Sequence, residues 1–293
     1  MNANTKLTPA TEIGAQSQSK LPIERRIVRF DYTDIKGTKF HSGNPVLSAF
    51  WVGLSATFPL GEAEFIRSVK LFEGRVIDPK LKADVADFAA QEAHHGLQHK
   101  KLNKHFDDNG FSTKKVEALI GEEINKRSAK WSDKKRLMHT VCAEHVTAVM
   151  AHYALTHPNS MHEVPESFRN MFLWHAIEEI EHKSVAFDVY QSTVGDMAAL
   201  KRHYFGFIFY EFPLSYFLIT RFLLKDRGHK ATWAERKGLF KFLFGKGGMI
   251  SSVKHLYMMF FKKGFHPWNH DDSALIGEWK DKLAPFYDVQ AKN

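Results

Sequence analysis

The chain of 293 residues contains a single cysteine, Cys142. One thiol cannot form an internal disulfide framework, and it cannot supply the several thiolates that cysteine-based zinc and iron–sulfur sites require. The first twenty residues contain no apolar segment like that of a signal peptide, and their small, polar composition predicts a flexible tail over residues 1–25. Both absences favour a protein of the reducing cytoplasm.

Strand-like sequence is scarce, and recognisable nucleic-acid-binding patterns are missing. Apart from a short stretch at 27–35, the apolar periodicity is that of helices, so the predicted fold class is all-α. The net charge of +8 comes with Lys and Arg gathered at 126–136 and 221–263. Because no helix-turn-helix, zinc-finger or RNP pattern accompanies this charge, we expect a membrane surface as partner and no nucleic acid.

Proline, glycine and capping residues mark the ends of the expected helices. Four long helices are predicted at 45–73, 79–107, 132–157 and 165–193. An amphipathic connector at 113–127 separates the second from the third, which is the plan of a ferritin-like four-helix bundle. We therefore predict a bundle at 26–195 and a C-terminal helical appendage at 196–293 that packs on it.

Two of these helices place Glu-x-x-His on an apolar seam. In the second helix, residues spaced alternately four and three apart lie on one face, which is the seam, and Leu, Val and Phe fill most of its positions. Glu92 and His95 occupy two positions of this seam. In the fourth helix, Glu179 and His182 do the same. Burying ionisable side chains without partners is costly, so a compensating cation is expected.

The first and third helices each contribute one glutamate to the same interior. Glu62 and Glu144 lie on the seams of these helices, whereas Glu64 lies about 200° around the helix from Glu62. One Glu from each of two helices with Glu-x-x-His from each of two others is the ligand set of ferritin-like di-iron and di-manganese proteins. Four carboxylates also balance two divalent cations, so we predict two iron ions, with manganese as the alternative.

Two further histidines extend this set. His175 lies four residues before Glu179 on the same seam and is predicted as a third imidazole ligand, with a structural core histidine as the alternative. His99, one turn after His95, is predicted as a ligand or as a group that orients one, with a simple core histidine as the alternative. The predicted metal ligands are therefore Glu62, Glu92, His95, Glu144, His175, Glu179 and His182.

Ionisable residues beside these motifs have other expected roles. Four of them point about 100° away from the seam and are expected in ion pairs, behind the ligands or at the surface: His94, His145, Glu178 and Glu181. Asp188 and Tyr190 are candidates for an outer layer or a channel.

Five runs carry a family resemblance: FPLGEAEF (58–65), QEAHHGLQH (91–99), AEHVTA (143–148), WHAIEEIEHKSVAFDVY (174–190) and GFHPW (264–268). Together they resemble a bacterial family described as predicted metal-dependent hydrolases, over roughly residues 25–275. The resemblance implies membership of the ferritin-like superfamily and a metal-dependent activity. The pattern of His175, Glu179 and His182 is also similar to one helix of the arylamine N-oxygenases, di-iron enzymes with an extra histidine ligand, and this likeness covers that motif only.

The segment 204–224 is strongly apolar and aromatic, and it is long enough to span a bilayer. Glu211 and Pro213 lie in its middle, which disfavours a lipid-exposed span. Three interpretations remain: a buried helix pair, an interfacial unit whose basic residues meet anionic lipid, and a membrane span. The interfacial interpretation predicts a peripheral membrane contact through 204–263. The same segment would line an apolar entrance to the metal site.

Three functions fit the predicted centre. The first hypothesis is a di-iron oxidase or oxygenase that uses O2 and an electron donor on a small apolar or aromatic molecule. The second is a dinuclear metal-dependent hydrolase of an ester or phosphoester. The third is iron storage, which the histidine-rich set and the long appendage disfavour. Carboxylates carried on helices favour the first hypothesis over the second.

Overall fold

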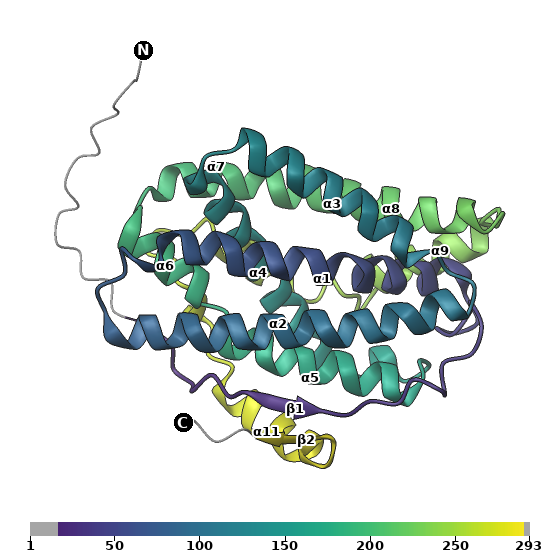
Figure 1. The fold of residues 1–293 in the computed structure, drawn as a ribbon. Coiled ribbons are helices and arrows are strands. Elements are labelled where there is room, and N and C mark those ends of the chain that lie inside the picture. Colours follow the sequence, from purple (N-terminus) through teal and green to yellow (C-terminus); the bar gives the residue numbers. More distant parts are fainter. Residues whose placement is uncertain (1–16, 290–293) are drawn as a thin grey trace.

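The computed structural model describes residues 17–289, and this part of the chain is mostly helical (Figure 1). The first half contains α1 (Pro45–Glu73), α2 (Pro79–Asp108), α3 (Thr113–Lys130), α4 (Asp133–Thr156), α5 (Glu166–His182) and α6 (Val185–Thr193). The second half contains α7 (Met197–Gly206), the π-helical segment η2 (Phe207–Glu211), α8 (Phe212–Asp226), α9 (Trp233–Phe244), α10 (Lys254–Met259) and α11 (Ser273–Leu283). The predicted all-α class agrees with this structure.

The first two helices begin at the capping residues that the sequence predicts. Asn44 caps α1 by accepting hydrogen bonds from the backbone N–H groups of Val46 and Leu47, and Pro45 fills the first position, where its missing N–H is no loss. Asp78 caps α2 in the same way. Figure 1 shows α1, α2 and α5 running side by side, with α3 and α8 along one flank. Their long shared interior is where the seam residues meet.

The fourth predicted helix is divided. The helical course of 165–193 is interrupted at Lys183 and Ser184, between α5 and α6. Both residues keep right-handed dihedral angles, so α6 continues from α5 after one tightened turn. At this turn Lys183 Nζ donates to Asp272 Oδ2 at 2.6 Å and to the His270 carbonyl at 2.8 Å, which ties the turn to the C-terminal segment.

The N-terminal segment packs on the helices earlier than the sequence suggests. Residues 1–16 of the predicted tail lie outside the described residues. Within 17–25, Ile23 is buried and the backbone N–H of Glu24 donates to Glu181. Strand β1 (Arg26–Val28) then pairs antiparallel with β2 (Tyr287–Val289), which joins the two ends of the described chain.

Helices α7, η2 and α8 form one continuous apolar stretch on the outside of α1 and α4. Among the described residues, two helical stretches are long and apolar enough to cross a membrane, Pro45–Glu73 and Met197–Asp226. In the apolar 18-residue window of the first, 72% is buried, as expected of a core helix, and in that of the second only 22%. The segment 204–224 is therefore not a fully buried helix pair, because its outer face is exposed.

We predict that Asn44→Ala lowers the free energy of unfolding by about 1–2 kcal/mol, because α1 loses its N-terminal cap. Asn44 Nδ2 also donates to the Glu235 carbonyl at 3.1 Å, so part of the loss comes from the contact with α9. Asn44→Asp keeps the cap oxygen and removes only that donor. Urea unfolding should therefore rank the two variants with Asp more stable than Ala, and equal stabilities would contradict this account of the cap.

Candidate metal centre

The seven predicted ligands lie together in the interior. They come from α1 (Glu62), α2 (Glu92, His95), α4 (Glu144) and α5 (His175, Glu179, His182), and none is more than 5% exposed. Gly96 of α2 leaves room for the Glu62 carboxylate, because a Cβ added there would lie 3.3 Å from Glu62 Oε2. The helical seams thus converge on one polar cluster inside an otherwise apolar core.

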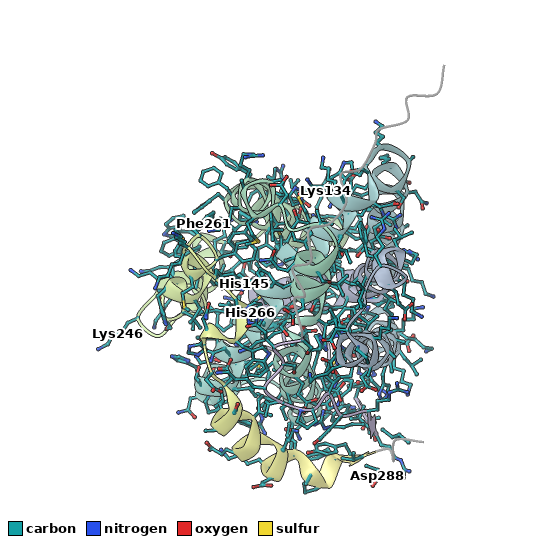
Figure 2. All side chains as sticks on the ribbon, turned by 90° about the vertical axis from the view of Figure 1, so that its left-hand side faces the viewer. Lys134, His145, Lys246, Phe261, His266 and Asp288 are labelled. Atoms are coloured by element: carbon teal, nitrogen blue, oxygen red, sulfur yellow. The ribbon has the colours of Figure 1, made fainter. Side chains whose placement is uncertain are left out.

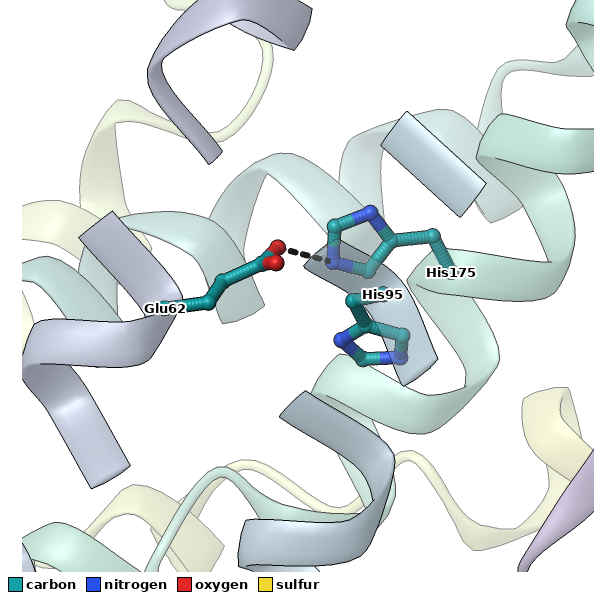
Figure 3. A group of neighbouring side chains, drawn as sticks. All are labelled: Glu62, His95 and His175. Carbon is teal, nitrogen blue, oxygen red and sulfur yellow. Dashed lines mark ion pairs between the residues drawn. The ribbon is translucent and has the colours of Figure 1, made fainter. Parts of the chain in front are cut away.

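The cluster consists of two groups of ligand atoms, with Glu179 close to both. On one side, His175 Nε2 lies 3.6 Å from Glu62 Oε1, and the ring of His95 lies beside it (Figure 3). On the other side, His182 Nε2 lies 3.0 Å from Glu92 Oε1 and 3.4 Å from Glu144 Oε2. Each group contains carboxylate and imidazole atoms close enough together to hold one metal ion.

Glu179 lies between the two groups. Its Oε1 is 2.8 Å from His175 Nε2 and 3.6 Å from His95 Nδ1, and its Oε2 is 3.7 Å from His182 Nε2. The two oxygens of one carboxylate therefore face different histidine groups. This is the position from which a carboxylate can bridge two ions.

In His95, His175 and His182, one ring nitrogen points into the cluster and the other makes a hydrogen bond to a residue outside it. His182 Nδ1 donates to Gln91 Oε1 at 2.8 Å. His95 Nε2 is hydrogen-bonded to Glu178 Oε2 at 3.0 Å, and His175 Nδ1 to His99 Nε2 at 2.9 Å. Such outer partners fix the tautomer and orientation of metal-binding imidazoles. His99 therefore lies behind His175, on the side away from the cluster.

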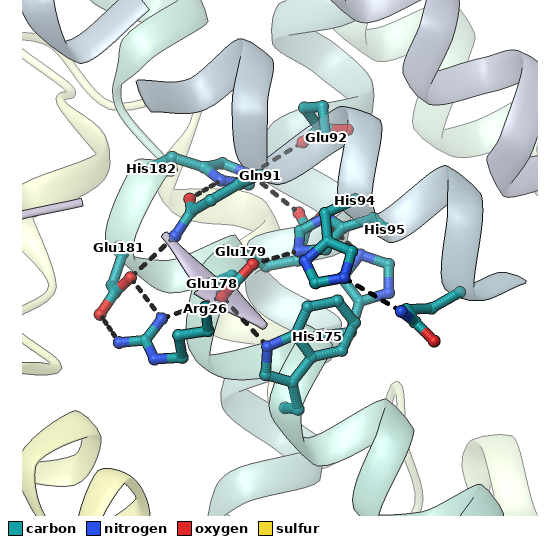
Figure 4. Close-up of polar contacts among 12 residues, drawn as sticks. Arg26, Gln91, Glu92, His94, His95, His175, Glu178, Glu179, Glu181 and His182 are labelled. Carbon is teal, nitrogen blue, oxygen red and sulfur yellow. Dashed lines mark hydrogen bonds and ion pairs between the residues drawn. The ribbon is translucent and has the colours of Figure 1, made fainter. Parts of the chain in front are cut away.

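A buried ion-pair network connects two of these outer partners (Figure 4). Arg26 Nη1 donates to Glu178 Oε1 at 3.1 Å, and Nη2 donates to Glu181 Oε1 at 2.6 Å. Gln91 Nε2 donates to Glu181 Oε2 at 2.9 Å. The chain of contacts runs from His95 through Glu178, Arg26, Glu181 and Gln91 to His182, so it joins one group to the other.

Sequence reasoning missed Arg26 and Gln91. Arg26 belongs to β1 and meets Glu178 and Glu181 across more than 150 residues of sequence, so no local periodicity identifies it. Gln91 precedes Glu92 and carries no motif of its own. The one feature of the sequence that could have pointed to Gln91 is its polar side chain next to the apolar seam of the helix.

Burial dominates the electrostatics of the cluster. It raises the pKa of Glu62 and of Glu92 well above the ordinary range, and the neighbouring carboxylates add to the effect. The pKa of Glu144 is raised to about 7, again mainly by burial. Burial acts the same way on Glu179, but the contacts with His182 and His175 outweigh it and hold its pKa well below the usual value. Four carboxylates in this space therefore need added positive charge to be ionised together.

The residues fit bound metal ions because most of their inward atoms make no hydrogen bond and contact only one another. Among the described residues, eighteen buried side-chain nitrogen and oxygen atoms make no hydrogen bond, and nine of them belong to six of the predicted ligands. These include both oxygens of Glu62, Glu92 and Glu144. Because unpaired buried polar atoms are rare and costly, a cluster of them marks a place where a ligand completes the structure. Carboxylate and imidazole suit Fe, Mn or Zn.

Two cavities reach the cluster from different sides. The larger, of about 180 Å³, touches Glu62 and is bounded by α1, α3, α4, η2 and α8. The smaller, of about 50 Å³, touches His175 and Glu179 and is lined mainly by apolar side chains. Phe58 and Thr147 form part of the wall of both.

Other residues singled out in the sequence contact different partners. Glu64 turns away from Glu62 and accepts from Arg136 Nε at 2.7 Å, as the periodicity predicts. Asp188 is paired with His266 at 2.8 Å, and the Tyr190 hydroxyl donates to the Asp196 carbonyl. Neither of these two contacts involves a predicted metal ligand.

The remaining predicted neighbours are structural. His94 is hydrogen-bonded to Gln98 at 3.0 Å. His145 packs against Phe260 and Phe265, and burial lowers its pKa to about 3. Figure 2 shows His145 within the fold beside His266 of the C-terminal segment, whose Phe265, His266 and Trp268 are buried. The GFHPW run therefore anchors that segment to α4 and α6.

A second group of potential metal donors lies nearer the surface: His152, His270 and Asp272. Asp272 is already paired with Lys183 Nζ at 2.6 Å and with His152 Nδ1 at 2.7 Å. Because an ammonium occupies one oxygen of its only carboxylate, this group is a weaker candidate than the interior cluster.

The fold and the cluster together define a helical protein with a buried centre that can hold metal ions. The chain belongs to the family described as predicted metal-dependent hydrolase, whose model matches residues 24–271. No curated protein and no solved structure matches the chain. The family description thus names metal dependence and hydrolysis for the family as a whole, without assigning residues.

We predict that Arg26→Ala destabilises the protein by about 3–5 kcal/mol, because it leaves Glu178 and Glu181 buried without their main cation. Lys104→Ala is a matched control, since Lys104 pairs with Asp108 at the surface, where such pairs contribute about 0–1 kcal/mol. Chemical unfolding of both variants checks the difference. A loss below about 1 kcal/mol for Arg26→Ala would contradict the structural role of the network.

We also predict that metal affinity rises with pH between about 6 and 8. Glu62, Glu92 and Glu144 have raised pKa values, so at the lower pH they keep protons that an entering cation must displace. As pH rises through about 7, the pKa of Glu144, the cost of displacing its proton disappears. Calorimetric titration with Mn²⁺ in buffers of different ionisation enthalpy should show proton release at pH 6, and an affinity independent of pH would contradict the assignment.

Proposed function

We propose that this protein is a metal-dependent hydrolase whose interior cluster holds two divalent ions in a ferritin-like arrangement of helices. The observation that carries the proposal is the concentration of unpaired buried carboxylate and imidazole atoms at the meeting point of α1, α2, α4 and α5. The description of the family supports the hydrolytic reaction.

The two groups of side chains suggest which residues hold which ion. Glu62, His95 and His175 would hold one ion, and Glu92, Glu144 and His182 would hold the other. Glu179 would bridge them, since its two oxygens face different groups. Bound ions of this kind polarise a carbonyl or phosphoryl oxygen and lower the pKa of water.

The larger cavity is the proposed substrate site. Glu62 is one of its lining residues, and its walls combine apolar side chains such as Phe58, Phe65 and Phe212 with charged ones such as Arg127 and Glu211. The apolar part of these walls favours an apolar substrate group. We therefore propose an ester or phosphoester of an apolar molecule, with its bond to be cleaved next to Glu62.

Oxidation with O2 is the second candidate, and the smaller cavity favours it. About 50 Å³ of apolar space beside His175 and Glu179 suits a small apolar gas molecule more than an ester. Iron would then be the metal, an electron donor would be required, and the extra histidine would correspond to the resemblance to arylamine N-oxygenases. This candidate requires Fe²⁺ and O2, whereas hydrolysis requires neither.

We predict that metal-free protein gains esterase or phosphoesterase activity when it is loaded with Zn²⁺ or Mn²⁺ in the absence of O2. The assay is a panel of chromogenic esters and phosphoesters with apolar groups of increasing length. Glu144→Gln keeps the shape of the side chain and removes its charge, so activity and bound metal should fall together, with activity lower by about a hundredfold.

Glu122→Gln is the matched control, because Glu122 is exposed on α3, where it pairs with Lys126. The control should keep both metal and activity. Full metal loading with no hydrolysis, together with O2 consumption by the reduced iron form, would replace hydrolysis by the oxidative candidate.

A further inference from the structure

The outer face of the α7–η2–α8 stretch is apolar and exposed. Phe205, Phe209, Leu214 and Phe217 are 49, 47, 56 and 61% exposed. They follow one another at intervals of three to five residues and so form one stripe along the helical stretch. An apolar stripe of this length on the outside of a protein marks a place where something else binds.

The inner face of the same stretch is fixed to the protein. Tyr204, Thr220 and Leu223 are buried, and the Tyr204 hydroxyl donates to the Tyr257 carbonyl at 3.1 Å. Glu211, in the middle, pairs with Arg127 at 2.7 Å. These contacts hold the helical stretch against α1, α3 and α4, so it lies along the surface and is not available to cross a bilayer (Figure 1).

Basic residues border the stripe. Arg202 precedes it, and Arg221 and Lys225 follow it, all three exposed. Helix α9 adds further exposed aromatic side chains with Lys237 and Lys241 between them. Lys246 extends from the loop after α9 at the edge of the molecule (Figure 2).

The charge of the protein is concentrated in this part of the chain. Residues 197–263 contain thirteen Lys and Arg against three acidic residues, so their net charge of +10 exceeds the +8 of the whole chain. The three acidic residues are engaged internally: Glu211 with Arg127, Asp226 with Lys115, and Glu235 with the cap of α9. The outward charge of this region is therefore almost entirely positive.

We propose that the exposed face of α7–η2–α8 docks on an anionic lipid bilayer, with the aromatic stripe in the interface and the basic residues on the headgroups. Apolar residues bordered by Lys and Arg are the pattern of helices that lie in the plane of a membrane. A second copy of the chain fits this face poorly, because a symmetric contact would bring the two positive borders together.

The same helical stretch forms a wall of the larger cavity. Phe207, Phe212, Tyr216 and Ile219 face that cavity, which reaches Glu62. Docking would therefore bring the cavity next to lipid, and an apolar substrate dissolved in the bilayer could reach the metal centre without crossing water. This last step rests on the proposed hydrolytic function, whereas the docking does not.

The docking is tested by flotation with vesicles of phosphatidylcholine alone or mixed with phosphatidylglycerol. Wild-type protein, with or without metal, should bind the anionic vesicles and release from them at high salt. Phe209→Ser with Phe217→Ser should weaken binding at least about tenfold. The matched control is Ile77→Ser with Leu97→Ser, two exposed apolar residues near or on α2, which should bind like wild type.

A charge pair of variants completes the test. Arg221→Glu with Lys225→Glu should weaken binding, whereas Lys100→Glu with Lys101→Glu, which makes the same change of net charge on α2, should weaken it less. The proposal would be overturned if wild-type protein did not bind anionic vesicles. It would also be overturned if the stripe variant, Phe209→Ser with Phe217→Ser, bound them as well as wild type. A dimer that the stripe variant dissociates, without vesicle binding, would assign the face to self-association instead.

Delivery from the bilayer has a separate readout. A long-chain ester presented in anionic vesicles should be hydrolysed more slowly by the Phe209→Ser, Phe217→Ser variant than by wild type, while a short soluble ester is hydrolysed equally by both. Vesicle binding without any hydrolysis would leave the docking intact and contradict the proposed function alone.

Discussion

Four glutamates from α1, α2, α4 and α5 meet in the interior, where little water can screen their charges. Each carboxylate raises the energy of its ionised neighbours, and burial adds to this for every one of them. His182 offsets part of the repulsion, since contacts with Glu92, Glu144 and Glu179 raise its pKa above the ordinary value although burial opposes this. One imidazolium cannot balance four carboxylates. The need for further positive charge is the constraint from which the proposed metal centre follows.

The surroundings of the cluster have the features that such a centre requires. Glu178, Gln91 and His99 each hold the outer nitrogen of one inward histidine, and Arg26 connects Glu178 to Glu181. Burial opposes the charge on Arg26, but the adjoining carboxylates, Glu181 first, raise its pKa above the usual value, so it remains a cation. Because β1 pairs with β2, the two ends of the described chain are joined beside this network. Orientation of the histidines thus depends on a segment outside the long helices.

Capping residues were sufficient to predict the ends of α1, α2 and α4, and local periodicity was sufficient to predict the inward residues. Helical geometry alone separates Glu62 from Glu64, and the structure places the first in the cluster and the second on Arg136. The same reasoning could not find Arg26, whose partners lie more than 150 residues away, nor the strand β2 that pairs with β1. The turn at Lys183 depends on Asp272, which is likewise a distant contact. Cavities are also beyond a sequence pattern, because their shape depends on packing between α1, α3, α4 and α8.

The most direct test of the account is anomalous X-ray diffraction from crystals grown with Mn²⁺ or Fe²⁺, recorded at the absorption edge of the metal. The account predicts two anomalous peaks in the interior, separated by about 3.5–4 Å as in other two-metal sites. One should lie among Glu62, His95 and His175, and the other among Glu92, Glu144 and His182. An empty interior in metal-loaded protein, or a single peak at His152, His270 and Asp272, would contradict it.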